Sequence, residues 1–133
     1  MRTDSTSYDF IIIGGGASGV FAAIIHKEHY PGSKVLIIEK TNKLLAKVKI
    51  SGGGRCNVSH HQKDPALLSL NYPRGQKELI GPFNQFCVEE TETWFNNNQV
   101  LLKTEVDGRM FPTTDNSQTI IDCFLQKIQA YQI

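Results

Sequence analysis

The stretch DFIIIGGGASGVFAAIIHKEHYPGSKVLIIE, residues 9–39, decides the fold. Residues 9–13 and 34–39 are short runs rich in Ile, Val and Leu, which is the pattern of strands buried on both faces of a parallel sheet. Residues 17–29 carry apolar side chains at helical spacing, and a Pro-Gly pair then ends the predicted helix. The order strand, glycine turn, helix and strand predicts a right-handed βαβ unit with two adjacent parallel strands.

The turn between the first strand and the helix, GGGASG, fits the pattern G-x-G-x-x-G. Gly14 permits the tight turn, Gly16 lets the backbone approach a pyrophosphate, and Gly19 lets the helix pack closely on the strand. The helix N-terminus offers free N–H groups and a partial positive charge to phosphates. We therefore expect a dinucleotide-binding turn made of Gly14, Gly15, Gly16, Ala17, Ser18 and Gly19.

Glu39 lies 20 residues after Gly19, at the end of the second strand. A carboxylate at this position accepts hydrogen bonds from the adenosine ribose, and it disfavours a 2′-phosphate, so NADP is not expected here. FAD and NAD remain equally compatible with the fingerprint, because both contain the ADP half that it binds. A plain turn followed by a solvated glutamate is the alternative interpretation.

A second glycine-rich turn, SGGGRCN, occupies residues 51–57. Its glycines could form a nest of N–H groups for an anion, to which Arg55 would add a fixed charge; a flexible linker is the alternative. Cys56 is either a thiol whose pKa is lowered by the arginine or a small buried residue, and we favour burial.

Short helices and a hairpin are expected in the remaining sequence. The helices are predicted at residues 77–86, 89–96 and 117–131, the last capped by Asp115 or Asn116. The hairpin strands are predicted at residues 100–103 and 109–111, around an Asp-Gly turn. The apolar stripe predicted for the last helix consists of Ile120, Ile121, Phe124, Leu125 and Ile128.

Two segments are less regular in sequence. Residues 41–51 fit either a short helix or an irregular basic arm. Residues 57–75 predict a loop with one helical turn at residues 65–69, and residues 1–8 predict a flexible tail.

The composition is that of one globular domain, with 133 residues, 40% apolar and 20% charged. The net charge of +1 gives no electrostatic reason to expect nucleic acid or an anionic membrane as a partner. The longest apolar run near the start is too short for a signal sequence or a membrane span. Cys56, Cys87 and Cys123 are widely spaced, so we expect free thiols in a reducing cytoplasm and no metal site.

Two segments carry a family resemblance: IIIGGGASG at residues 11–19 and ISGGGRCN at residues 50–57. Together they resemble the bacterial flavoproteins known as NAD(P)/FAD-dependent or aminoacetone-oxidase-like oxidoreductases, which include a bile-acid dehydro-reductase class. NYPRGQKELIGPF and DGRMFPTTDNSQTIIDC, further along, extend the resemblance to about residues 9–128. The ISGGGRCN segment is specific for this family, whereas G-x-G-x-x-G is not.

The resemblance implies an FAD cofactor, with NAD(P)H open as an electron donor. Residues 14–19 would hold the pyrophosphate, Glu39 the adenosine ribose, and Lys40 would lie near the adenine. Arg109 would approach the second glycine turn. The residues of that turn implied to lie along FAD are Gly53, Gly54, Arg55, Cys56 and Asn57. No catalytic residue is implied, and Asp107, Asp115, His60 and His61 are candidates only by residue type.

Members of the family are about three times as long as this chain. Residues 9–133 are therefore expected to be the N-terminal part of an FAD/NAD(P)-binding α/β domain, with a Rossmann-like βαβ unit and an incomplete parallel sheet. Three functions stay open: an FAD-dependent oxidoreductase that is not competent from this chain alone, a non-catalytic nucleotide-binding module, and an inactive truncated product. The sequence leaves the substrate and the oligomeric state open.

Overall fold

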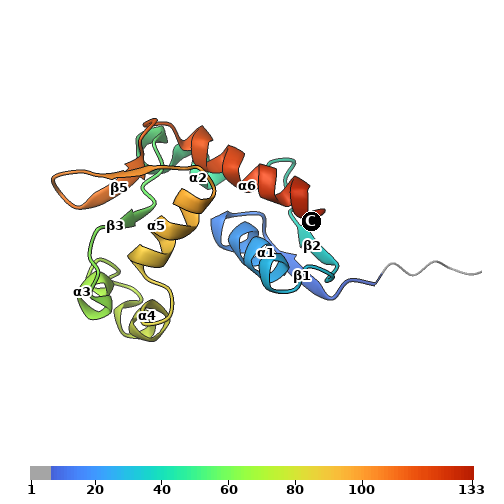
Figure 1. Cartoon of the computed structure of the whole chain (residues 1–133), viewed down its shortest axis with the longest axis horizontal. Coiled ribbons are helices and arrows are strands. Elements are labelled where there is room, and N and C mark those ends of the chain that lie inside the picture. The colour runs from blue at the N-terminus through green and yellow to red at the C-terminus, as the bar shows by residue number, and fades with distance from the viewer. Residues whose placement is uncertain (1–6) are drawn as a thin grey trace, which may run out of the picture.

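The computed structural model describes residues 7–133, so most of the tail predicted for residues 1–8 lies outside the described residues. The chain forms both helices and short strands (Figure 1). In chain order they are β1 (Phe10–Ile13), α1 (Ala17–His29), β2 (Val35–Ile38), α2 (Ala46–Ile50), the 3₁₀ turn η1 (Ser51–Gly54), β3 (Ser59–His60), α3 (Pro65–Ser69), α4 (Gln76–Phe83), α5 (Val88–Asn97), β4 (Leu102–Thr104), β5 (Arg109–Pro112) and α6 (Ser117–Tyr131).

The predicted βαβ unit is present at the N-terminus. Strands β1 and β2 pair in parallel, in a register that sets Phe10 beside Val35 and Ile13 beside Ile38. Helix α1 covers one face of this pair, where the Phe10 ring stacks on His26 with 4.5 Å between ring centroids. The glycine turn therefore lies where β1 ends and α1 begins.

The prediction that these strands are buried on both faces is wrong. Ile11, Ile13 and Ile38 expose 53%, 87% and 48% of their surface. Side chains alternate between the two faces of a strand, and among residues 7–133 only the α1 face is covered. The apolar sequence thus suits a sheet with two covered faces, of which the described chain covers one.

A second, antiparallel sheet has the order β3-β5-β4. The hairpin of β4 and β5 confirms the prediction from the Asp-Gly pair, although β4 begins at Leu102 and Val100 lies in the core instead. Strand β3 was not predicted, because a two-residue strand leaves no periodic pattern. It places Ser59 beside Met110 and His60 beside Arg109.

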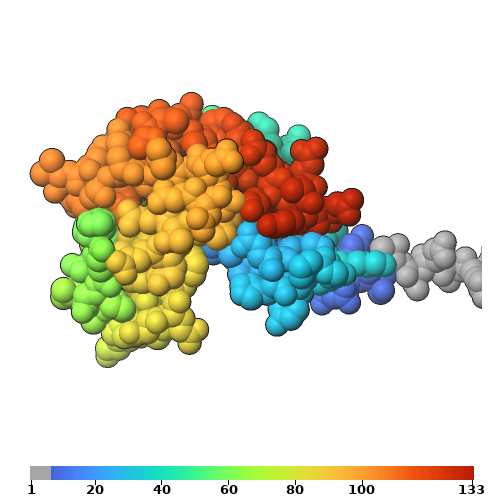
Figure 2. Space-filling view, viewed as in Figure 1, coloured from blue at the N-terminus to red at the C-terminus, as the bar shows by residue number. Residues whose placement is uncertain are grey.

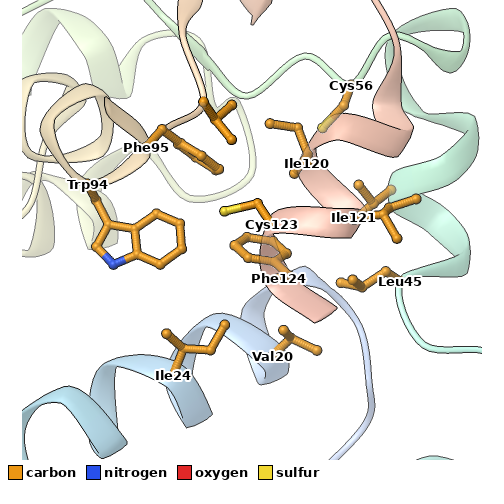
Figure 3. Packing of buried hydrophobic residues seen from close by; sticks show 12 residues of the cluster. Val20, Ile24, Leu45, Cys56, Trp94, Phe95, Ile120, Ile121, Cys123 and Phe124 are labelled. Carbon is orange, nitrogen blue, oxygen red and sulfur yellow. The ribbon is translucent and has the colours of Figure 1, made fainter. Parts of the chain in front are cut away.

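The core lies where α6 crosses α1 and α5 (Figure 3). In the space-filling view, α6 rests directly on α1 (Figure 2). The buried cluster consists of Val20, Ile24, Leu45, Val48, Cys56, Trp94, Phe95, Val100, Ile120, Ile121, Cys123 and Phe124. Leu125 was predicted to join it but is 39% exposed.

Two helix ends are set by local hydrogen bonds. The Asn116 side chain accepts a hydrogen bond from the Gln118 N–H at 2.9 Å, so Asn116, and not Asp115, caps α6. Helix α4 was predicted to end at residue 86 but ends at Phe83. The next residue, Asn84, donates a hydrogen bond from its side-chain amide to the Ile80 carbonyl. No helix within residues 7–133 is long and apolar enough to cross a membrane.

The close packing of α1 on β1 yields a first prediction. A Cβ at Gly19 would lie 2.2 Å from the Gly14 carbonyl oxygen and 3.1 Å from Ile12 Cγ2. Gly19→Ala should therefore lower the free energy of unfolding by about 1–3 kcal/mol, measured by chemical denaturation. Gly32→Ala is the matched control, because a Cβ there meets nothing within 4 Å. Equal stability of the two variants would contradict the packing described for Gly19.

Candidate dinucleotide-binding site

The first glycine turn is fixed by close contacts as well as by backbone conformation. Gly14 has φ of +106°, a conformation that favours glycine, and its N–H donates to the Ile38 carbonyl at 2.7 Å. Gly15 is buried, and a Cβ there would lie 2.2 Å from Leu44 Cδ2. These two glycines hold the turn against the end of β2.

Glu39 binds the turn directly. Its Oε2 accepts a hydrogen bond from the Gly15 N–H at 2.8 Å, and its Oε1 accepts one from the Thr41 N–H at 2.9 Å. The Gly15 hydrogen bond, followed by the Thr41 bond, holds the pKa of this carboxyl below its usual value. Glu39 is therefore ionised at neutral pH, and each oxygen keeps a further lone pair for a ligand hydroxyl.

The start of α1 is open beside this carboxylate. Gly16 is the N-cap residue, and neither a side-chain cap nor an acidic residue in the first turn occupies the helix N-terminus. A Cβ at Gly16 would meet no atom within 4 Å, and Ala17 and Ser18 are exposed. The glycine is thus not required there by contacts within the chain, whereas the uncapped N–H groups suit an anion.

A short segment joins the first glycine turn to the second. The Leu45 N–H donates to the Gly15 carbonyl at 2.7 Å, and α2 then leads into η1. This resolves residues 41–51 as a short helix after an irregular start. Gly52, Gly53 and Gly54 have φ of 55°, 68° and 87°, respectively, so the second turn needs its glycines.

Arg55 is engaged by carboxylates of the same chain. Its guanidinium pairs with Glu105 at 2.5 Å and Asp115 at 3.5 Å, and its Cζ lies 3.9 Å from the centre of the Phe111 ring. The hydrogen bond from Arg55 to Glu105 raises the pKa of the guanidinium. In this arrangement Arg55 fastens the second glycine turn to the hairpin, whereas the sequence suggested a free anion ligand.

Arg109 lies near the same contacts. Its Nε is 2.7 Å from Asp107, its terminal nitrogen is 3.7 Å from Glu105, and its Cζ is 5.5 Å from the centre of the Phe111 ring. Glu105 and Phe111 therefore bring the two arginines together. Sequence reasoning did not single out Glu105 or Phe111. Only the predicted hairpin turn, which lies between them, pointed to this part of the chain.

Cys56 and Asn57 complete the second turn. Cys56 is buried, and burial raises the pKa of its thiol, so the thiol stays protonated, as expected of a small packing residue. The Asn57 side-chain oxygen accepts a hydrogen bond from the Met110 N–H at 3.3 Å, which ties the turn to β5. Lys40 is exposed next to Glu39.

Three of the four residues that were candidates only by type contact other groups of the chain through their side chains. Asp107 accepts from the Arg109 backbone, which is the main cause of its lowered pKa. Asp115 pairs with Lys103, which lowers its pKa in turn. Both carboxyls are therefore ionised at neutral pH and do not supply an acid. His60 contacts the Asp107 carbonyl at 3.1 Å, and His61 is exposed.

Comparison with known proteins identifies the family of the chain. The model of the HI0933-like protein Rossmann domain matches residues 8–133. The chain is 28% identical over 122 residues to the ribosomal RNA dihydrouridine synthase of Escherichia coli and 25% identical over 122 residues to the 3-dehydro-bile acid delta(4,6)-reductase of Clostridium scindens. Each alignment covers 92% of this chain and 29% of the relative.

The chain therefore spans less than a third of the length of these curated relatives. The match confirms the family resemblance and the Rossmann-type fold that the two glycine-rich segments predicted. From its βαβ unit to helix α6, this chain belongs to the HI0933-like Rossmann domain family.

Proposed function

We propose that the chain is the N-terminal FAD-binding part of a flavin-dependent oxidoreductase. The observation that carries the proposal is the open, uncapped start of α1 at Gly16, directly beside the ionised carboxylate of Glu39. The free N–H groups at the start of α1 can donate hydrogen bonds to a pyrophosphate, and the neighbouring Glu39 carboxylate can accept hydrogen bonds from the adenosine ribose of the same dinucleotide.

In this proposal each part of the site has a binding task. The N–H groups of residues 16–19 hold the pyrophosphate, Glu39 holds the ribose, and Lys40 lies toward the adenine. The backbone of Gly53 and Gly54 lies along the remainder of FAD, since a Cβ at either position would meet no atom of this chain within 4 Å. The bound flavin would supply the electron transfer, and the chain supplies binding and orientation.

Arg55, Cys56 and Asn57 serve this site by holding the second turn in place. Arg55 connects it to Glu105 and Phe111, and Asn57 connects it to β5. Cys56 is buried in the core cluster, which also holds the turn. We therefore assign these three residues a positioning role.

The two relatives favour a cofactor role for the matched region. Their names specify chemically different substrates, ribosomal RNA in one case and a bile acid in the other. A region that two such proteins share is better suited to a common cofactor than to either substrate. NAD(P)H remains our proposal for the electron donor. We propose that residues outside the matched region determine the substrate class in these proteins.

A nucleotide-binding module without catalysis is the second candidate. It is favoured by one observation: the carboxyls that were candidates for acid-base work, Asp107 and Asp115, form ion pairs with basic side chains. Such a module would bind ADP and FAD with similar affinity, whereas a site that extends to the flavin would prefer FAD.

The direct test compares flavin retention in two variants. The purified chain should show flavin absorbance, or bind added FAD, and mass spectrometry should identify the released cofactor as FAD. Gly16→Thr should abolish binding while the protein stays folded, because the side chain fills the space for the pyrophosphate and threonine remains an acceptable N-cap. Gly32→Thr, at another open glycine, should bind normally. Equal FAD binding by both variants would exclude this site.

A second prediction concerns Glu39. Glu39→Ala should weaken FAD binding roughly tenfold or more, by removing a charged acceptor for the ribose. Isothermal titration calorimetry measures this change, and Glu78→Ala, at an exposed helix position, is the control. Unchanged affinity would mean that Glu39 serves only to hold Gly15.

The pH dependence of stability tests the Glu39 contacts without any ligand. Since the native pKa lies below the ordinary 4.5, ionised Glu39 stabilises the fold above that pH, and the contribution is lost as the pH falls further. The wild type should therefore be more stable than Glu39→Gln at pH 7, and the difference should shrink below about pH 4.5 in thermal unfolding. A constant difference would argue against the hydrogen bonds from Gly15 and Thr41.

A further inference from the structure

Leu45 has an unusual backbone conformation for a buried aliphatic residue. Its φ and ψ are 59° and 22°, in the left-handed region that leucine rarely occupies. Only 1% of its surface is exposed, and its side chain lies in the core cluster with Val20 and Ile121 (Figure 3). A conformation that costs free energy persists because the surrounding packing holds it, and such conformations concentrate at functional sites.

The backbone of Leu45 makes two hydrogen bonds in this conformation. Its N–H donates to the Gly15 carbonyl at 2.7 Å, and its carbonyl accepts from the Lys49 N–H at 3.1 Å. The second bond begins α2, but the residue that precedes a helix usually has an extended backbone. Because the start of α2 does not require the left-handed conformation, we attribute it to the contact with Gly15.

The Gly15 carbonyl and the Gly16 N–H belong to the same peptide group. In a planar trans peptide these two groups point in opposite directions, and no peptide bond within residues 7–133 is cis. With its carbonyl held by Leu45, this peptide directs the Gly16 N–H away from Leu45. Within residues 7–133 the Gly16 N–H donates to no acceptor, so its orientation serves no contact in this part of the chain.

The preceding peptide group is also held at both ends. The Gly15 N–H donates to Glu39, and the Gly14 carbonyl oxygen lies against Gly19, where a Cβ would approach it to 2.2 Å. Two successive peptide groups therefore have fixed orientations, one held by Glu39 and the other by Leu45. Only the peptide held by Leu45 carries the Gly16 N–H.

We propose that Leu45 is a positioning residue for the pyrophosphate, because its main-chain N–H fixes the peptide group that presents the Gly16 N–H to the phosphates. This role rests on the proposed function and adds a residue that does not itself touch the ligand. Glu39 serves the ribose, so Leu45 should affect only ligands that carry phosphates. ADP has both the ribose and a pyrophosphate, whereas adenosine has the ribose alone.

The test removes the Leu45 N–H and keeps the side chain. Incorporation of the α-hydroxy analogue of leucine by nonsense suppression turns the peptide bond before residue 45 into an ester, which has no N–H donor. The affinity for ADP should fall about tenfold or more, as expected when a hydrogen bond to a charged group is misaligned. The affinity for adenosine should stay unchanged. NMR titration of the full chain with each ligand measures both affinities.

The matched control is the corresponding ester at Val100, another buried aliphatic residue, whose N–H donates to the Phe95 carbonyl at 2.9 Å. This ester should lower stability to a similar degree and bind ADP like the wild type. Unchanged ADP affinity in the Leu45 ester, equal losses in both esters, or equal losses for ADP and adenosine would each overturn the positioning role alone. Absence of ADP binding by the wild type would overturn the proposed function as well.

Hydrogen exchange in the wild type tests the same role without a substitution. Coupling between two contacts is reciprocal, so ADP must strengthen the Leu45 hydrogen bond if that bond helps to bind ADP. Saturating ADP should therefore slow exchange of the Leu45 amide more than that of the Val100 amide. Adenosine should slow the two amides equally or not at all. Equal slowing of both amides by ADP would contradict the positioning role.

Discussion

The hydrogen bond from the Gly15 N–H to the Glu39 carboxylate is the contact on which the candidate site depends. It joins the turn after β1 to the residue after β2, and the Leu45 N–H then binds the Gly15 carbonyl from the other side. The peptide groups around Gly15 are therefore held by two later segments. This leaves the next residues, at the start of α1, free to bind something outside the chain.

Helix α6, although far along the sequence, packs against the segments that carry the two glycine turns. Helix α6 packs on α1 and α2, and the Ser117 hydroxyl donates to the Lys49 carbonyl at 2.8 Å. The Trp94 indole N–H donates to Glu28 of α1 at 3.2 Å, so α5 is tied to the same helix. The two glycine turns therefore adjoin helices that pack in one hydrophobic core, although the turns come from different segments of the chain.

Sequence reasoning predicted the parts of the fold that short patterns determine. The βαβ unit, the hairpin and the last helix each have a local signal: a glycine turn between apolar runs, an Asp-Gly pair and an apolar stripe after Asn116. Sequence reasoning failed for contacts between residues that lie far apart in the sequence. The engagement of Arg55 by Glu105, 50 residues away, has no local signature. Nor can an apolar strand such as residues 10–13 reveal whether a second layer covers it.

We propose that an anionic dinucleotide binds at the start of α1, and amide chemical shifts test this binding residue by residue. In a ¹⁵N-labelled chain titrated with FAD and separately with ADP, we expect the largest shifts at Gly15, Gly16, Ala17 and Ser18. FAD, but not ADP, should also shift Gly53 and Gly54. Shifts confined to other surfaces, such as the hairpin at residues 104–107, or no shifts at saturating ligand, would contradict it.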